Sequence, residues 1–228
     1  MNQLLQQLQT NDWTLLVSLP RNDVELAQAA LNGGAQGLKV HINVEHFASG
    51  TKFGSFDEEK ESLQAIIAVA REYSASVGIV PGGNPFAGRE EFASLAQIGI
   101  DYFDAYPGDA PAWTFDQNDL DIMLAAWNGA REEELLSLEE LGMTLCEASI
   151  MHHDDYGQPL NTLDLARYHD LAQTISVPFI VPSQKLLLPA DQKLLQQVGA
   201  KGVLIGAIVT GREAASLEAA TRAFKNAL

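Results

Sequence analysis

The feature that most constrains the fold of this chain is an alternation, repeated eight times, between short apolar segments and longer segments with helical periodicity. The short segments are rich in β-branched and aromatic residues, which is typical of buried strands. Strands that alternate with helices in this way form parallel sheets built from βαβ units. The predicted strands span residues 13–19, 37–43, 76–81, 100–106, 121–127, 143–151, 177–182 and 201–207.

Eight such units in 228 residues predict one (β/α)8 barrel (TIM barrel) domain that spans residues 1–228. A doubly wound open sheet is the main alternative fold, because strands and helices alternate along the chain in both folds. An open sheet of this length usually has fewer strands and a glycine-rich first turn, whereas the first turn here reads LPRND. We therefore favour the barrel.

Two parts of the chain depart from a regular barrel pattern. The fourth unit, PGDAPAWTFDQN, contains two prolines and no helical period, so we expect its helix to be short or missing. The N-terminal segment MNQLLQQLQT predicts an extra helix. That helix would close the bottom of the barrel, although a solvated or dimer-facing helix fits the pattern equally well.

Charge and composition limit the partners of this protein. Thirty acidic and 14 basic residues give a net charge of −16, which disfavours nucleic acid and anionic membrane surfaces. No apolar run approaches the roughly 20 residues that span a bilayer. The single cysteine and the absence of a signal-peptide pattern at the N-terminus lead us to expect a cytoplasmic protein.

Polar residues that face the barrel axis are the candidates for chemistry. In the segment GLKVHIN the apolar residues should face the helices, which turns Lys39, His41 and Asn43 inward. Burying a lysine and a histidine on one strand face costs folding free energy unless they are paired with other polar groups. Such residues are therefore candidates for a functional site.

The same alternation turns polar residues of three other strands inward. They are Ser18, then Tyr102, Asp104 and Tyr106, and then Glu147 and Ser149. Lys39 opposite Asp104 or Glu147 would form a proton-transfer or carbonyl-polarising pair. The alternative is a structural ion pair that fills the barrel. We take Lys39, His41, Asp104 and Glu147 as candidate catalytic residues.

Two long polar loops are expected at the same end of the barrel. The loop NVEHFASGTKFGSF follows the second strand and predicts a lid. The loop MHHDDYGQPLN follows the sixth strand and offers His152 and His153 as hydrogen-bonding substrate ligands. A divalent metal on residues 152–155, completed by Glu45, His46 or Asp104, is a less favoured alternative, so we predict no metal or other cofactor.

The last two units predict a small anion site. The loop after the seventh strand carries Ser183, Gln184 and Lys185, and the eighth strand ends at Gly206 and Ala207. Small residues at this point let backbone N–H groups approach an anion. With Ser18 from the first strand, these residues predict a phosphate-binding pocket, although Gly206 has a plain turn role as its alternative.

Both ends of the chain resemble a known family. The opening LLVSLPRNDVELAQAALNGGAQGLKV and the closing FIVPSQKLLLPADQKLLQQVGAKGVLIGAIVTG are similar to the first and last units of ribulose-phosphate-binding barrels, nearest to the N-acetylmannosamine-6-phosphate 2-epimerase family. The likeness covers about the first 40 and the last 50 residues. It implies that Lys39 stands where the epimerases keep a substrate-binding arginine, that Asp104 matches an inward aspartate, and that Lys185 and Gly206 lie in phosphate loops. It also makes a homodimer one expected assembly.

The family's two proton-transfer residues are absent from this chain. Where the epimerases have a catalytic lysine after the third strand, the chain reads GIVPGGNP, and where they have Ala-Glu-Gly after the seventh strand, it reads Val181-Pro182-Ser183. The epimerase reaction therefore cannot be carried over.

Three hypotheses of function remain. The first is an enzyme that acts on a small phosphorylated sugar or related anion by proton transfer next to a carbonyl, as an isomerase, an epimerase or an aldol-type lyase. Lys39 would serve as cation or acid, or would form a Schiff base, with Glu147 or Asp104 as base. The second is a non-catalytic barrel that binds a phosphorylated metabolite. The third is a metal-dependent lyase.

Overall fold

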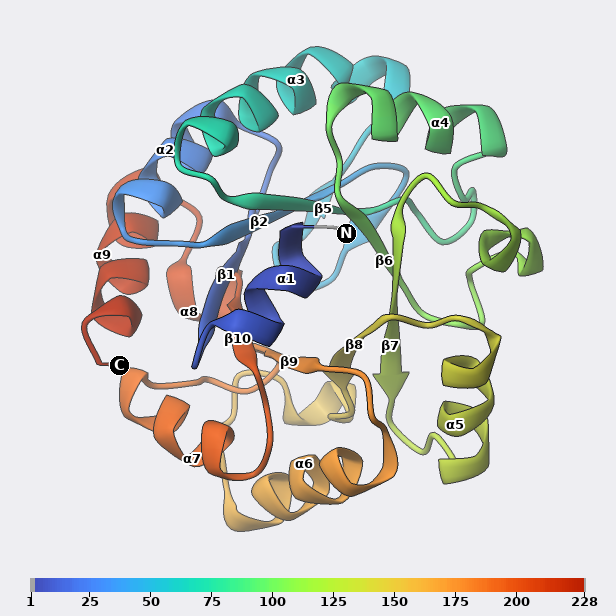
Figure 1. Ribbon diagram of the computed structural model, residues 1–228. Coiled ribbons are helices and arrows are strands. Elements are labelled where there is room, and N and C mark those ends of the chain that lie inside the picture. The colour runs from blue at the N-terminus through green and yellow to red at the C-terminus, as the bar shows by residue number, and fades with distance from the viewer. Residues whose placement is uncertain (1–2, 228) are drawn as a thin grey trace.

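The computed structural model describes residues 3–227 and contains a closed barrel of eight parallel strands (Figure 1). Around the barrel the strands follow the order β1, β10, β9, β8, β7, β6, β5, β2. Their bounds are Thr14–Ser18 for β1, Gly37–His41 for β2, Ser76–Val80 for β5, Tyr102–Ala105 for β6, Asp121–Trp127 for β7, Leu145–Ser149 for β8, Phe179–Pro182 for β9 and Gly202–Ile205 for β10. Each lies within a predicted strand, so the predicted barrel is confirmed and the open sheet is excluded.

Helices surround the barrel in chain order and cover its outer face. They are α2 (Val24–Asn32), α3 (Phe56–Glu72), α4 (Arg89–Ile98), α5 (Glu132–Leu141), α6 (Thr162–Thr174), α7 (Gln192–Gln197) and α9 (Ala214–Lys225), with a short α8 (Ala207–Thr210) directly after β10. Glycines with positive φ follow α2, α4, α5 and α7 as Gly34, Gly99, Gly142 and Gly199, and a left-handed glycine commonly ends a helix.

The fourth unit has no α-helix. Between β6 and β7 the chain forms only the 3₁₀ turn η1 (Ala112–Asp116), which starts after Pro111. Two further 3₁₀ turns are η2 (His153–Asp155) after β8 and η3 (Pro189–Asp191) before α7. The predicted short or missing fourth helix is confirmed.

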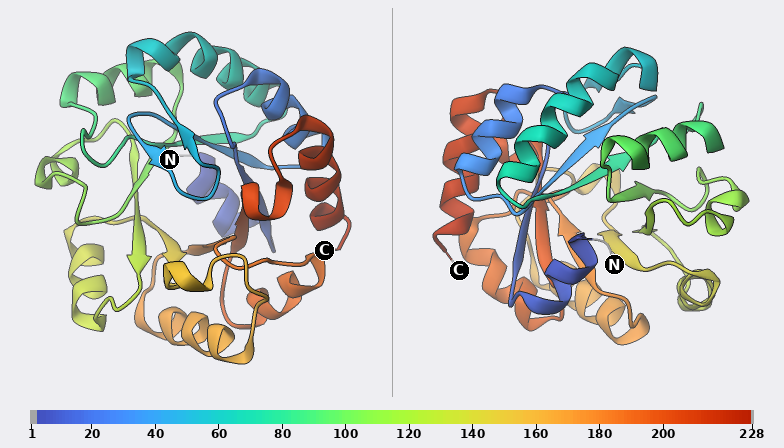
Figure 2. Two further views of the ribbon diagram at one scale, coloured as in Figure 1. Left: turned by 180° about the vertical axis from the view of Figure 1, so that it is seen from behind. Right: turned by 45° about the horizontal axis from the view of Figure 1, so that its top comes forward.

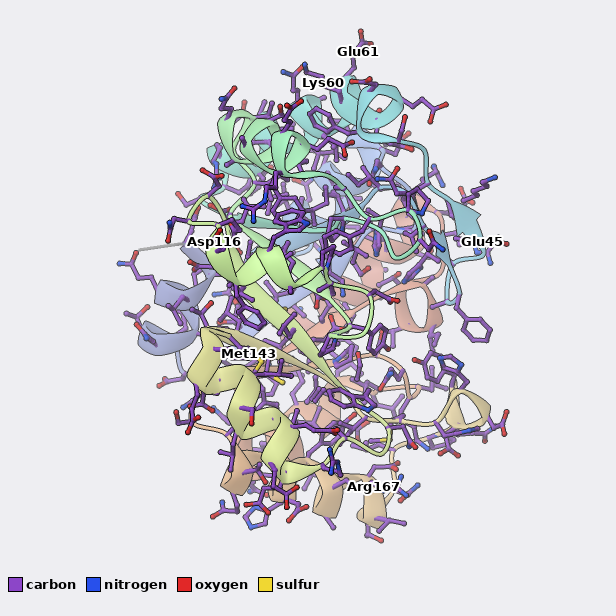
Figure 3. The ribbon with its side chains drawn as sticks, turned by 90° about the vertical axis from the view of Figure 1, so that its right-hand side faces the viewer. Glu45, Lys60, Glu61, Asp116, Met143 and Arg167 are labelled. Atoms are coloured by element: carbon purple, nitrogen blue, oxygen red, sulfur yellow. The ribbon has the colours of Figure 1, made fainter. Side chains whose placement is uncertain are left out.

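The loop after β2 folds into a hairpin of its own. Its strands β3 (Glu45–His46) and β4 (Thr51–Lys52) pair antiparallel and do not join the barrel. In Figure 2 the hairpin lies over the barrel opening at the end opposite α1, close to the loop after β8. Figure 3 shows Glu45 of β3 at that far end. This is the end at which the barrel strands finish.

The helix α1 (Gln3–Thr10) closes the bottom of the barrel. Leu4 and Leu8 of α1 are buried, and they belong to a cluster inside the barrel. The other buried members of that cluster are Leu16, Tyr102, Met123, Leu145, Ile180 and Leu204, one from each of six strands. The prediction that the N-terminal helix closes the bottom of the barrel is therefore confirmed.

The alternation along each strand divides the core into two layers. Leu38 and Val40 of β2 pack with the helices, as predicted, while Lys39 and His41 face the interior. Asn43 does not continue this alternation, because β2 ends at His41 and Asn43 has a φ of 54°. The interior is therefore apolar at the α1 end and polar at the other.

No helix within residues 3–227 combines the length and the apolar character needed to cross a bilayer.

We predict that Leu8→Ala lowers the free energy of unfolding by about 2–5 kcal/mol, because it leaves a cavity at the closed end of the barrel. Urea unfolding would measure the change. Leu141→Ala is the matched control, since Leu141 is 61% exposed, and it should stay within about 0.5 kcal/mol. Equal, small effects of both substitutions would show that α1 does not seal the barrel.

Candidate functional site

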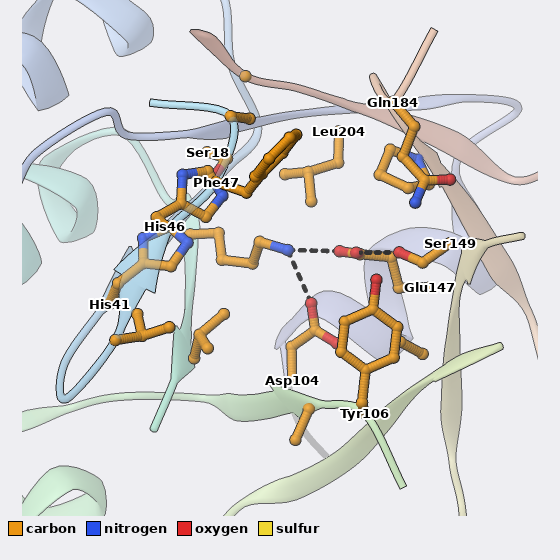
Figure 4. A pocket seen from close by; sticks show the side chains of 18 of the residues that line it. Ser18, His41, His46, Phe47, Asp104, Tyr106, Glu147, Ser149, Gln184 and Leu204 are labelled. Atoms are coloured by element: carbon orange, nitrogen blue, oxygen red, sulfur yellow. Dashed lines mark hydrogen bonds and ion pairs between the residues drawn. The ribbon is translucent and has the colours of Figure 1, made fainter. Parts of the chain in front are cut away.

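A cavity of about 300 Å³ opens at the C-terminal ends of the barrel strands. Its walls come from the barrel interior, from the β3–β4 hairpin and from the loops after β8, β9 and β10 (Figure 4). The predicted site residues that line it are Ser18, Lys39, His41, Asp104, Glu147, His153, Ser183, Gln184, Gly206 and Ala207. This volume is at the lower end of the range for ligand sites, which suits a small metabolite.

Lys39 is paired with both predicted carboxylates at the centre of this cavity. Its Nζ lies 2.8 Å from Oδ2 of Asp104 and also forms a hydrogen-bonded ion pair with Oε2 of Glu147. The three residues are 6%, 3% and 7% exposed, respectively. In Figure 4 dashed lines mark these contacts and the bond that the Ser149 hydroxyl donates to Oε1 of Glu147 at 2.7 Å.

The three charges of this cluster do not titrate as they would in water. Burial raises the pKa of the Asp104 carboxyl well above its usual value, and the neighbouring Glu147 raises it further. Burial also disfavours the charged form of Glu147, but the Lys39 ammonium and hydrogen bonds outweigh it, so the pKa of Glu147 is lowered. Burial opposes the charge of Lys39 too, yet the two carboxyl groups raise the pKa of Lys39 above its ordinary value. Within this cluster Lys39 therefore favours its ammonium form and Glu147 its carboxylate form, while Asp104 favours its protonated form.

Polar groups from the neighbouring loops extend this cluster toward the mouth. Tyr106 and Tyr156 line the cavity, and Gln184 donates a hydrogen bond of 2.6 Å from Nε2 to the Tyr156 hydroxyl. Burial raises the pKa of both tyrosines, so both stay protonated at neutral pH. Tyr156 was not predicted as a site residue, since nothing in the spacing of its loop distinguishes it from its neighbours.

Aromatic rings cover the cavity from two loops. Phe47 of the hairpin stacks on His153 with ring centroids 5.3 Å apart and meets Tyr156 edge-on at 5.6 Å. His41 lies beneath the hairpin, 4.6 Å from His46 and 4.7 Å from Phe53. The lid predicted after the second strand thus folds over the cavity. His46, which the sequence offered only as a metal ligand, lines the cavity, and so does Phe47, which the sequence did not single out.

His41 is fully buried, and neither of its ring nitrogens has a hydrogen-bond partner among residues 3–227. Burial, with the nearby His46 and Lys39, lowers the pKa of His41 well below its usual value. His41 therefore lines the cavity as a neutral imidazole.

Small residues form the opposite side of the cavity, where β1, β9 and β10 end. The Gly206 N–H donates to Oγ of Ser183 at 2.8 Å, and Ser18 lies next to both. A Cβ on Gly206 would contact Cβ of Ser18 at 3.5 Å. Ala207 and Ile208 follow at the start of α8, where the first N–H groups of a helix have no partner within it.

Two predicted phosphate ligands lie outside the cavity lining. Lys185 turns away from it and pairs with Oδ2 of Asp164 at 3.2 Å, each residue being 2% exposed. The Asp164 carboxylate lies in the first turn of α6, so Lys185 fastens the loop after β9 to that helix. His152 is exposed and accepts a hydrogen bond from the Asp154 N–H at its own 3₁₀ turn.

Within residues 3–227 no three His, Cys, Asp or Glu side chains are grouped so that they could hold a metal ion. Residues 152–155 therefore do not form such a group with Glu45, His46 or Asp104.

Comparisons with known proteins identify the fold. No protein-family model matches the sequence, and neither does any curated protein. Among solved structures, thiamine phosphate pyrophosphorylase from Pyrococcus furiosus matches with a TM-score of 0.69 and 17% identity over 95% of this chain and 96% of that one. Tryptophan synthase from M. tuberculosis matches with a TM-score of 0.73 and 14% identity over 98% and 96%. The structure described as native KDPGal matches at 0.66 and 13% over 93% of each chain.

The chain is thus a (β/α)8 barrel whose fold resembles the folds of these solved structures at low sequence identity. Likeness at these identities shows the fold alone. The nearer resemblance to the epimerase family stays a prediction from the sequence.

The raised pKa of Asp104 predicts how its contribution to stability depends on pH. Above the ordinary aspartate pKa of 3.8, the unfolded chain loses this proton while the folded protein keeps it, so the contribution falls as pH rises. Asp104→Asn should therefore gain stability relative to the parent protein between pH 4 and 7, by up to about 1.4 kcal/mol per pH unit. Urea unfolding across that range would measure the difference.

Asp119→Asn is the control for this experiment, because Asp119 is exposed on the surface. The stability of Asp104→Asn is compared with that of this surface substitution at each pH. A relative stability of Asp104→Asn that declines with rising pH would mean that Asp104 is ionised in the folded protein.

Proposed function

We propose that this protein is an enzyme that moves a proton on the carbon next to a carbonyl of a small phosphorylated sugar or related anion. An isomerase or epimerase fits this chemistry best, and an aldol-type lyase uses the same proton removal when it runs in the direction of condensation. The observation that carries the proposal is the pairing of one ammonium with two unequal carboxyl groups at the floor of an enclosed cavity.

The two carboxyl groups differ in pKa, so one can accept a proton and the other can donate one. Glu147 is a carboxylate at neutral pH, because its pKa is lowered, and is the base in this proposal. Asp104 keeps its proton, because burial raises its pKa, and is the acid. Two titratable groups whose surroundings push their pKa values apart are the usual basis of an acid–base pair. In the proposed reaction Glu147 removes the proton from carbon, and Asp104 delivers one to oxygen or carbon.

Lys39 acts as a cation in this proposal. Its raised pKa keeps the ammonium charged, and a charged ammonium favours the negative charge that develops on the carbonyl oxygen when the neighbouring carbon loses its proton. A Schiff base would require the free amine, which the two carboxyl partners disfavour. Of the two roles open to Lys39, we therefore propose the electrostatic one.

The anion is proposed to bind at the small-residue side of the cavity. Ser18, Ser183, Gly206 and Ala207 line that side, and serine hydroxyls together with backbone N–H groups can hold phosphate without a positive side chain. Gln184 and His153 border the same space. We do not include Lys185 among the proposed phosphate ligands, because its Nζ forms an ion pair with Asp164. The homodimer implied by the sequence resemblance stays a prediction.

A non-catalytic barrel that binds a phosphorylated metabolite is the second candidate. The feature that favours it is the absence of the epimerase lysine from GIVPGGNP (residues 78–85) and of the epimerase glutamate from Val181–Ser183.

Deuterium exchange separates the two candidates. Incubation in D₂O with a panel of phosphorylated ketoses, aldoses and N-acetylhexosamines should place deuterium on the carbon next to the carbonyl of the substrate, which proton NMR detects. We predict that Glu147→Gln slows this exchange about 100- to 10,000-fold, because general base catalysis contributes that much. Glu61→Gln, which changes an exposed residue of α3, is the control and should exchange at the parent rate.

Exchange that survives Glu147→Gln unchanged would remove Glu147 as the base. Binding of a phosphorylated panel member without any exchange by the parent protein would favour the non-catalytic barrel.

A further inference from the structure

The β3–β4 hairpin carries a histidine that the acid–base pair does not use. His46 ends β3 and lines the cavity. Its ring lies beside that of His41, and Figure 4 shows it across the cavity from Glu147 and Ser149. The hairpin therefore brings a second polar face to the space above the Lys39 cluster.

The turn of the hairpin determines which nitrogen of His46 carries the proton. Gly50 has a φ of 62° and donates its N–H to the carbonyl of His46 at 2.8 Å, which closes the turn. The turn directs the N–H of Ser49 to Nδ1 of His46 at 3.3 Å, and the Ser49 hydroxyl lies 2.9 Å from the same atom. A backbone N–H can only donate, so Nδ1 is the acceptor and the ring proton resides on Nε2.

This tautomer leaves a hydrogen-bond donor without a protein partner. Nε2 of His46 forms no hydrogen bond within residues 3–227, and the residue is only partly buried. Ser49, in contrast, is fully buried, so the contact that sets the tautomer is shielded from water. Burial and the Lys39 ammonium lower the pKa of His46 to about 4, partly offset by Glu147. The imidazole is therefore neutral at physiological pH.

We propose that His46 is a specificity-determining residue whose Nε2–H donates a hydrogen bond to a substrate oxygen above Lys39, and that the ligand is thus a carbonyl or enediolate compound with one oxygen on the reacting carbon and one on the carbon next to it. This proposal rests on the proposed function. Lys39 meets one oxygen from the barrel floor, and His46 meets the other from the hairpin. A neutral imidazole suits this role because it donates a hydrogen bond without adding a second cation beside Lys39.

The tautomer can be tested without any ligand. In protein labelled with ¹⁵N-histidine, long-range ¹H–¹⁵N NMR should show His46 as the neutral Nε2–H form from pH 5 to 8, with its signals assigned by their loss in His46→Gln. Ser49→Pro, which removes the N–H, should shift the signals toward a mixture of tautomers. A protonated or Nδ1–H ring at pH 7 would overturn the proposal, whatever the reaction is.

Binding tests the role itself, with 2-phosphoglycolate as the probe. Its carboxylate has the two oxygens of an enediolate, and its phosphate supplies the anion. We expect His46→Leu to weaken binding, measured by calorimetry, about 10- to 100-fold, because it removes a hydrogen bond to a charged oxygen. His46→Gln keeps an amide donor near the position of Nε2 and should recover most of the affinity. His169→Leu, at the other end of the barrel, should bind as the parent protein does.

The outcomes separate the two proposals. Parent-level binding and deuterium exchange by His46→Leu would refute the role of His46 and leave the proposed function standing. Failure of the parent protein both to bind 2-phosphoglycolate and to exchange any panel sugar would refute the proposed function, and the role of His46 with it.

Discussion

The Lys39 ammonium holds together the polar half of the barrel interior. Without it, Asp104 and Glu147 would be two carboxyl groups buried side by side with no cation, an arrangement that costs several kcal/mol. With it, one carboxylate is balanced, and burial favours the protonated form of the other carboxyl group. The electrostatics that make this cluster tolerable in the fold are the same electrostatics that divide it into an acid, a base and a cation.

The rest of the barrel isolates this cluster from water on most sides. The α1 plug and the apolar layer around Tyr102 close the bottom, and the ring of Tyr102 fits only because Gly78 has no Cβ, which would lie 2.0 Å from it. Above the cluster, the hairpin and the loop after β8 meet through Phe47 and His153. A small cavity remains between these layers, so the strength of each charge interaction there exceeds what it would be in water.

The fold and much of the site were predictable because both follow from alternation. The strand pattern gives the barrel, and its phase turns Lys39, Asp104 and Glu147 toward one axis, where the structure brings them into contact. Loop residues do not follow that rule. Lys185 lies three residues beyond β9, and its direction depends on Asp164 of α6, a partner 21 positions away in the sequence. Likewise, His46 enters the cavity through a turn closed by Gly50 and held by Ser49. Such contacts depend on how separate loops pack, which periodicity does not encode.

We expect the buried cluster to hold one carboxylic acid, on Asp104, at neutral pH. Infrared difference spectroscopy tests it most directly, because a protonated carboxyl group absorbs apart from a carboxylate and shifts on transfer to D₂O. We expect a carboxylic acid band at pH 7 in the parent protein that disappears in Asp104→Asn and persists in the surface control Asp119→Asn. A parent protein without such a band, or a band that survives Asp104→Asn, would contradict it.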